Sequence, residues 1–199
     1  MKPLHLAVAF LPLITFSLLS RVLPSGDIGV AGLVAAVIAA AAMVTMRPTW
    51  PPKIINACSL ALFTALAITG FTGGAGTDRW LATWAGAGVG LVLGLVILAL
   101  IPVVPFTEQY AREATPQANW GSPTFRQINR VLSVSWGAAI VALGVSRVAA
   151  AAIDEHVASR TAPQLILSLL VPVAILVYMF KFSKSYPERV AQHGVAQHG

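Results

Sequence analysis

The sequence predicts an all-α fold, a polytopic transmembrane helix bundle, and three observations support this prediction. First, 57% of the 199 residues are hydrophobic and only 10% are charged, whereas soluble domains carry roughly 25% charged residues. Second, the apolar residues form blocks about as long as a transmembrane helix, which needs roughly 20 residues to cross the hydrocarbon core. Third, Arg and Lys gather in alternate gaps between these blocks, a pattern typical of proteins with several spans.

Six apolar blocks are predicted to cross the membrane, and they are 4–23, 28–46, 53–72, 80–104, 131–152 and 163–182. Five spans are the main alternative, because the second and third blocks are short or interrupted by polar residues. The six blocks pair into three helical hairpins, whose outer connections are rich in the turn formers Pro, Gly and Asp. We expect the first block to be an uncleaved span rather than a signal peptide, because no small-x-small cleavage pattern follows it. The prediction is one transmembrane domain over 1–185 and a flexible C-terminal tail over 186–199.

Basic residues lie mainly on one side of this predicted bundle. The side that holds both termini and the 46–53 and 105–130 connections carries nine of them: Lys2, Arg47, Lys53, Arg112, Arg126, Arg130, Lys181, Lys184 and Arg189. The opposite side carries four: Arg21, Arg79, Arg147 and Arg160. Because Arg and Lys in short loops resist translocation, the first side and both termini are predicted to be cytoplasmic. The expected location is the bacterial cytoplasmic (inner) membrane, with anionic lipid headgroups as the partner of the basic face. These headgroups explain the pI of about 10.1 without a nucleic-acid partner.

The residue types that bind metals and cofactors are scarce and badly placed for this role. Cys58 is the single cysteine, which excludes an intrachain disulfide and any site that needs several cysteines. The histidines are predicted to lie in the termini or a loop: His5, His156, His193 and His198. No acidic residue lies in the middle of a predicted span, so a carboxylate proton relay is also absent. We therefore expect no metal site and no cofactor.

The fourth apolar block carries glycines at intervals of four residues, namely Gly86, Gly90 and Gly94. Residues four apart lie on one face of a helix, and glycines there let another backbone approach closely. The pattern predicts a helix-packing seam, formed either with another helix of this chain or between copies in a homo-oligomer.

The 105–130 segment is the longest polar stretch and is rich in both charged and aromatic residues. Its first part is predicted to be a short helix, in which Glu108 and Arg112 have the favourable spacing of four. Ser122 before Pro123 is predicted to cap the helix that follows. The segment is either an interfacial connector that anchors the bundle or a docking surface for a protein partner or anionic lipid. The residues of that predicted docking surface are Glu108, Tyr110, Arg112, Trp120, Arg126, Asn129 and Arg130.

Two pairs of residues interrupt the apolar blocks. Pro12 and Pro172 lie inside the first and sixth predicted spans and are expected to kink them. Arg21 and Arg147 lie near the outer ends of the first and fifth spans. Charged residues close to the membrane core often mark functional sites, but these two are near enough to the interface to serve as snorkelling anchors.

Two segments carry a family resemblance: Phe10-Leu-Pro-Leu-Ile-Thr-Phe16, and Pro123-Thr-Phe-Arg-Gln-Ile-Asn129 running on to Trp136 and Gly144. They resemble the bacterial intracellular septation protein A (YciB-like) membrane protein family, whose second segment reads Pro-x-Trp-x-x-Leu-Asn followed by a Trp. Phe125 stands where that pattern has its first Trp. The resemblance implies a small polytopic inner-membrane protein with a role in envelope maintenance and division, exerted through protein partners.

Three functions are consistent with these observations. The first is a small cytoplasmic-membrane scaffold or accessory subunit, which docks a membrane protein partner or a second copy through the 105–130 segment. The second is a transporter or channel for a neutral or lipid-like small molecule, which passes between the kinked first and sixth spans. The third is a lipid-modifying membrane enzyme that uses the cluster Glu108, Tyr110, Arg112 and Glu113. The sequence favours the first function, and an enzyme is the least supported of the three.

Overall fold

The computed structural model describes residues 3–45, 53–154 and 166–196, and this part of the chain contains helices and turns but no strand. The long helices are α1 (Pro3–Val22), α2 (Ile28–Thr45), α3 (Ile54–Thr72), α4 (Ala75–Leu100), α6 (Pro123–Asp154) and α8 (Val171–Ala196). A short helix, α5 (Phe106–Ala111), is followed by 3₁₀ turns over Arg112–Ala114 and Gln117–Asn119. Predictions that concern Lys2, Arg47, His156, Arg160 and His198 lie outside the described residues.

Within the described residues, four helices are long and apolar enough to cross a membrane, namely α2, α3, α4 and most of α6. Helix α1 adds a shorter apolar stretch, Val8–Val22. The prediction of an all-helical chain with several helices of membrane-spanning length is therefore confirmed for the described residues. Crossing of the membrane by α1 and α8 stays a prediction. Charged residues from Lys181 onward interrupt the apolar run of α8, which shortens the part of this helix that could cross a membrane.

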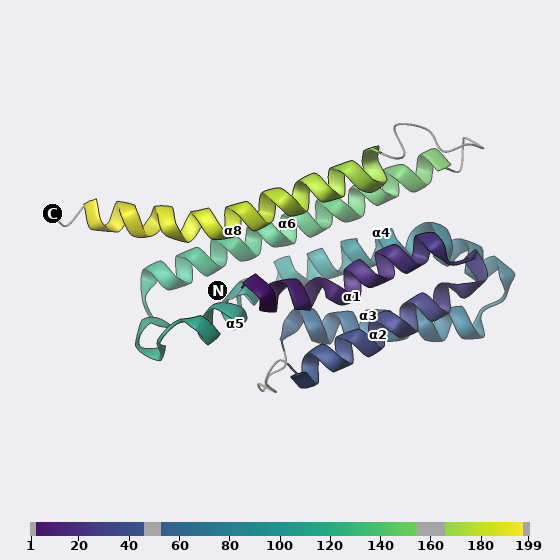
Figure 1. Cartoon of the computed structure of the whole chain (residues 1–199), viewed down its shortest axis with the longest axis horizontal. Helices are drawn as coiled ribbons and strands as arrows, with labels where there is room; N and C mark the ends of the chain where they lie inside the picture. The colour runs from purple at the N-terminus through teal and green to yellow at the C-terminus, as the bar shows by residue number, and fades with distance from the viewer. Residues whose placement is uncertain (1–2, 46–52, 155–165, 197–199) are drawn as a thin grey trace.

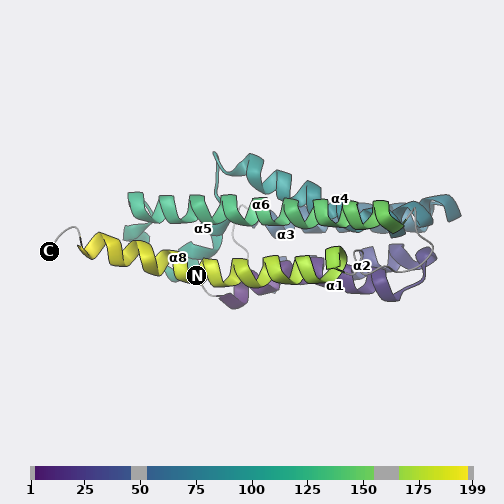
Figure 2. The same ribbon diagram turned by 90° about the horizontal axis from the view of Figure 1, so that it is seen from above.

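The long helices lie side by side and alternate in direction (Figure 1). The end of α1, the start of α2, the turn between α3 and α4 and the end of α6 lie at one end of the molecule. The start of α1, α5, the start of α6 and the end of α8 lie toward the other. Seen from above, α1 and α8 lie on one side, with α4 and α6 facing them (Figure 2). Which of these two ends faces the cytoplasm stays a prediction from the division of basic residues.

Small residues bring the helices of two neighbouring pairs, α2 with α3 and α4 with α6, close together. In α2 and α3, a Cβ added at Gly29 would lie 3.1 Å from the backbone of Gly70, and one at Gly32 would lie 2.9 Å from that of Ala67. Three alanines of the same helix, Ala31, Ala35 and Ala39, are also fully buried. The close approach replaces large side chains with backbone contacts, the kind of packing that stabilises helices in lipid.

The predicted glycine seam of α4 lies against α6 of the same chain. A Cβ at Gly90 would lie 3.1 Å from the Cα of Gly144, and one at Gly94 would lie 2.8 Å from the backbone nitrogen of Val141. Gly86, the third member, faces the side chain of Arg147 instead. The seam therefore joins two helices of one molecule at Gly90 and Gly94, and at Gly86 the Arg147 side chain fills the space between them.

Proline and serine residues set the boundaries of α6 and α8. Helix α6 begins at Pro123, and the Ser122 hydroxyl oxygen accepts the backbone N–H of Phe125 at 3.2 Å, as expected of an N-cap. Pro172 follows a turn of π-helix over Ile166–Leu170 and lies at the start of regular helix, a common cause of local irregularity. Helix α8 then continues to Ala196, through part of the segment that the sequence predicts to be a flexible tail.

Candidate functional site

A half-open cavity of about 390 Å³ lies between α1, α4, α6 and α8. This volume falls within the range of small-molecule sites, about 300–1,000 Å³. Its walls are almost wholly apolar and include Phe10, Ile14, Leu143, Val173, Leu176 and Phe180. It lies between α1 and the Pro172 end of α8, where the sequence predicts a path for a lipid-like molecule.

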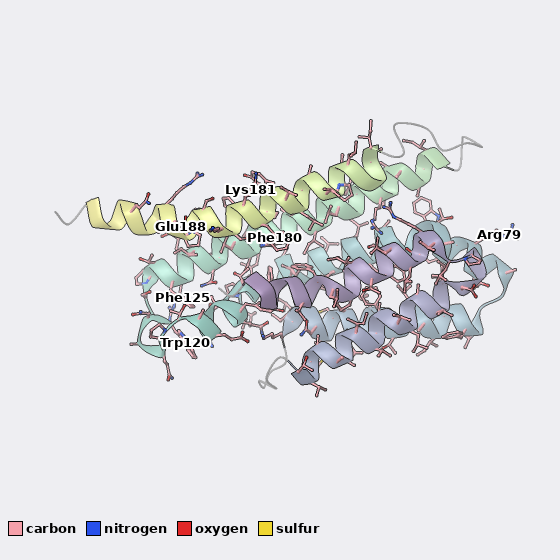
Figure 3. The ribbon with its side chains drawn as sticks, in the orientation of Figure 1. Arg79, Trp120, Phe125, Phe180, Lys181 and Glu188 are labelled. Atoms are coloured by element: carbon pink, nitrogen blue, oxygen red, sulfur yellow. The ribbon has the colours of Figure 1, made fainter. Side chains whose placement is uncertain are left out.

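Aromatic packing closes the cavity at the end nearer α5. Phe10 stacks on Trp136 with ring centroids 5.0 Å apart, and Phe180 meets the same indole edge-on at 5.4 Å. Trp136 is fully buried, and its indole N–H donates to the Ser183 hydroxyl oxygen at 2.8 Å. Phe180 lies at the middle of α8, beside α6, in Figure 3. One end of the cavity is thus a fixed aromatic wall.

Two arginines line the opposite end of the cavity. Arg21 lies one residue before the end of α1 and is exposed, whereas Arg147 lies inside α6 and is half-buried. Both guanidinium groups therefore place positive charge at the same end of one cavity. The Arg147 guanidinium occupies the space that a side chain on Gly86 would fill. In the part of the chain that the structure describes, no carboxylate forms an ion pair with Arg147.

The lining favours binding rather than chemistry. Its polar members are Ser17, Arg21 and Arg147, and the Ser17 hydroxyl already donates to the Leu13 carbonyl oxygen at 2.7 Å. Among the residues that the structure describes, the lining includes no Asp, Glu, His, Cys or Tyr that would act as a general acid, base or nucleophile. A cavity with apolar walls and a cationic end matches the polarity of an amphipathic molecule.

The predicted docking residues of the 105–130 segment divide into a buried and an exposed group. Glu108, Tyr110 and Asn129 are 8%, 1% and 2% exposed, respectively, so they face the protein interior. The Glu108 carboxylate accepts two hydrogen bonds from Arg112, at 2.5 and 3.1 Å. The Arg112 guanidinium also lies over the Trp120 ring, 4.9 Å from its centroid. Most of these side chains therefore stabilise the segment itself.

Arg112 is exposed, and so are the other two basic members of the predicted docking surface, Arg126 and Arg130. The latter two lie four residues apart near the start of α6 and so share one helix face. Phe125 and Trp120 lie close to this end of the molecule, far from Arg79 at the other end (Figure 3). The members of the predicted docking surface that reach the protein surface are Arg112, Trp120, Arg126 and Arg130, and docking there stays a prediction.

Contacts between segments that are far apart in the sequence fix α5 in place, and no local sequence pattern predicts them. Lys53, just before α3, forms an ion pair with Glu113, and the Ile54 N–H donates to the Gln109 side-chain oxygen at 2.9 Å. On the other side of α5, the Thr107 hydroxyl donates to the Asn129 carbonyl oxygen at 2.8 Å and lies 2.9 Å from the Ser133 hydroxyl. These bonds tie the segment to α3 and α6, as an anchoring connector requires.

Burial also changes the ionisation of Tyr110. Loss of solvent raises the pKa of its hydroxyl well above the ordinary value of 10, and the nearby Glu113 carboxylate raises it further. The Lys53 ammonium lies over the tyrosine ring, 4.6 Å from its centroid. The cluster predicted for a lipid-modifying enzyme thus has both of its carboxylates in ion pairs and its hydroxyl held neutral.

Neither metal-binding residues nor similar proteins help to identify the function of this site. No group of three or more His, Cys, Asp or Glu residues in the described segments is placed to hold a metal ion. Comparisons of the chain with protein-family models, curated proteins and solved structures found no match. The cavity and its charges are therefore the features from which a function is inferred.

Proposed function

We propose that this chain is a multi-pass protein of the bacterial cytoplasmic membrane that binds a lipid-like molecule in the cavity between α1, α4, α6 and α8. In this proposal α1 and α8 also cross the bilayer, so that there are six spans and both termini are cytoplasmic. The observation that carries the proposal is the apolar cavity itself, which joins a closed aromatic end to a cationic end. Binding of this kind serves either transport of the molecule or its presentation to other proteins.

Filling the cavity tests this proposal. Leu143 lines the cavity, whereas Val134, on the same helix, is 44% exposed on the outside. Native mass spectrometry of protein extracted in mild detergent should show a bound lipid, and Leu143→Trp should remove it. Val134→Trp, which adds similar bulk outside the cavity, should leave the adduct in place. Protein that carries no lipid, or that keeps it equally in both variants, would contradict the proposal.

Docking of a membrane protein partner at the cytoplasmic end is a second candidate function. It is supported by the exposed Arg126 and Arg130 on one face of α6, and by the resemblance to a family implicated in envelope maintenance. Reversing both charges should abolish co-purification of the partner and leave the melting temperature unchanged. An unchanged pull-down would count against docking at this face.

A further inference from the structure

We propose that the molecule held in the cavity is an anionic membrane lipid, whose phosphate lies between Arg21 and Arg147 and whose acyl chain follows the apolar wall toward Phe10 and Phe180. This inference rests on the proposed function and names the class of lipid that the site prefers. It is carried by the placement of Arg147, by the second guanidinium group at the same end of the cavity and by the polarity of the cavity along its length.

The position of Arg147 within α6 is the first observation that supports an anionic ligand. It lies seven residues before the end of α6, or about 10 Å along the helix axis. A guanidinium at this depth loses hydration, and such residues usually pair or face a water-filled cavity. Gly86 has no side chain, and the Arg147 guanidinium occupies the space that one would fill. No carboxylate among the described residues pairs with it.

A second arginine at the same end of the cavity favours a single anion that binds between the two guanidinium groups. Arg21 reaches the same end of the cavity from α1, and two positive groups that share one end of an apolar cavity repel each other. A phosphate between them replaces this repulsion with two attractions. Guanidinium groups also match phosphate in geometry, because their N–H donors bind two oxygens of the same group side by side.

The apolar part of the site has the direction that a lipid chain requires. From Arg21, the lining residues of α1 descend through Ser17 and Ile14 to Phe10, a distance of about 16 Å along the helix. On α6 they descend from Arg147 through Leu143 to Ile140. The charged end lies at the outer end of both helices, so the headgroup would belong to the outer leaflet. The occupant is therefore expected to come from the bilayer rather than from solution.

A lipid-binding measurement with matched headgroups tests the inference. Delipidated protein in detergent is titrated with phosphatidylglycerol, phosphatidylcholine and diacylglycerol of the same chain length, and native mass spectrometry counts the bound species. Wild-type protein should bind phosphatidylglycerol at least about tenfold more tightly than diacylglycerol, a difference typical of charge-assisted hydrogen bonds. Arg147→Gln should abolish this preference, and Arg147→Lys should retain part of it.

Arg79→Gln is the matched control. Arg79 is exposed at the same end of the molecule and does not line the cavity (Figure 3). This variant should bind phosphatidylglycerol as the wild type does, and its melting temperature together with that of Arg147→Gln shows that both variants are folded. If Arg147→Gln fails to fold, the partial preference of Arg147→Lys carries the test.

The outcomes separate this inference from the proposed function. Equal binding of diacylglycerol and phosphatidylglycerol by wild-type protein, with loss of both in Leu143→Trp, would overturn the anionic headgroup and keep the lipid site. Absence of binding by all three lipids would overturn both. Full displacement of phosphatidylglycerol by inorganic phosphate at equal concentration would also overturn the inference, because the acyl chain would then contribute nothing.

Discussion

Lys53 shows how a residue that reads as a surface cation becomes part of the interior. Its side chain is 4% exposed, its ammonium pairs with Glu113, and it lies over the ring of Tyr110. The pairing joins two positions that are 60 residues apart in the chain. Local patterns do not reveal contacts of this range. The sequence therefore predicts the side of the membrane for Lys53 but not its partner.

Breaking this ion pair should destabilise the fold, because it leaves a buried cation without its counter-charge. We expect Glu113→Gln to lower the free energy of unfolding by about 2 kcal/mol, less than for a fully buried pair since Glu113 is partly exposed. Thermal unfolding in detergent measures the change. Glu188→Gln, at an exposed position of α8, is the control and should have little effect. Equal melting temperatures for the two variants would contradict this account of α5.

Tyr110 should stay protonated in mildly alkaline solution. Burial raises the pKa of its hydroxyl above 10, so the folded state holds this proton more tightly than the unfolded state. The resulting stability is fully present below about pH 10 and is lost as the pH rises through the folded-state pKa. Tyrosinate absorbance of the wild type minus that of Tyr110→Phe isolates this group. The difference should remain near zero at pH 10, and half of its full amplitude at that pH would show that Tyr110 is solvated.

Helix α4 illustrates what can be predicted at the scale of an element. The spacing of Gly86, Gly90 and Gly94 predicts a close approach, because four-residue intervals fix a helix face. Its partner could not be inferred, since the matching Gly137 and Gly144 of α6 lie seven residues apart and do not form the same pattern. The start of α6 was more accessible, because Ser122 and Pro123 carry a local capping signal.

A large side chain in the seam should separate α4 from α6. A Cβ at Gly94 already meets the backbone of Val141, whereas one at Gly88 meets nothing within 4 Å. We expect Gly94→Leu to lower the free energy of unfolding by about 3 kcal/mol or to prevent folding, as overpacked sites do. Gly88→Leu, on the open face of the same helix, should be tolerated. Thermal unfolding in detergent compares them, and similar loss in both would show that the seam is not the tight contact.

At the scale of the whole molecule, composition predicted the helical class and hydropathy located the long helices. The long helices alternate in direction (Figure 1), and the side of the membrane on which each end lies stays a prediction from the basic residues. The cavity was not predictable in the same way, because its walls come from four helices that meet only in three dimensions. The sequence did single out Arg21, Arg147 and the Pro172 end of the sixth block. It offered no means of placing them around one space.

Sidedness in the membrane is the claim on which the rest of the account depends. Gly121 and Gly74 suit single-cysteine labelling, because a Cβ at either position meets nothing within 4 Å. With Cys58 replaced by Ser, Gly74→Cys should react with a membrane-impermeant thiol reagent in intact cells. Gly121→Cys should react only after the cells are permeabilised. Labelling of Gly121→Cys in intact cells, or recovery of the chain in the soluble fraction without detergent, would contradict the account.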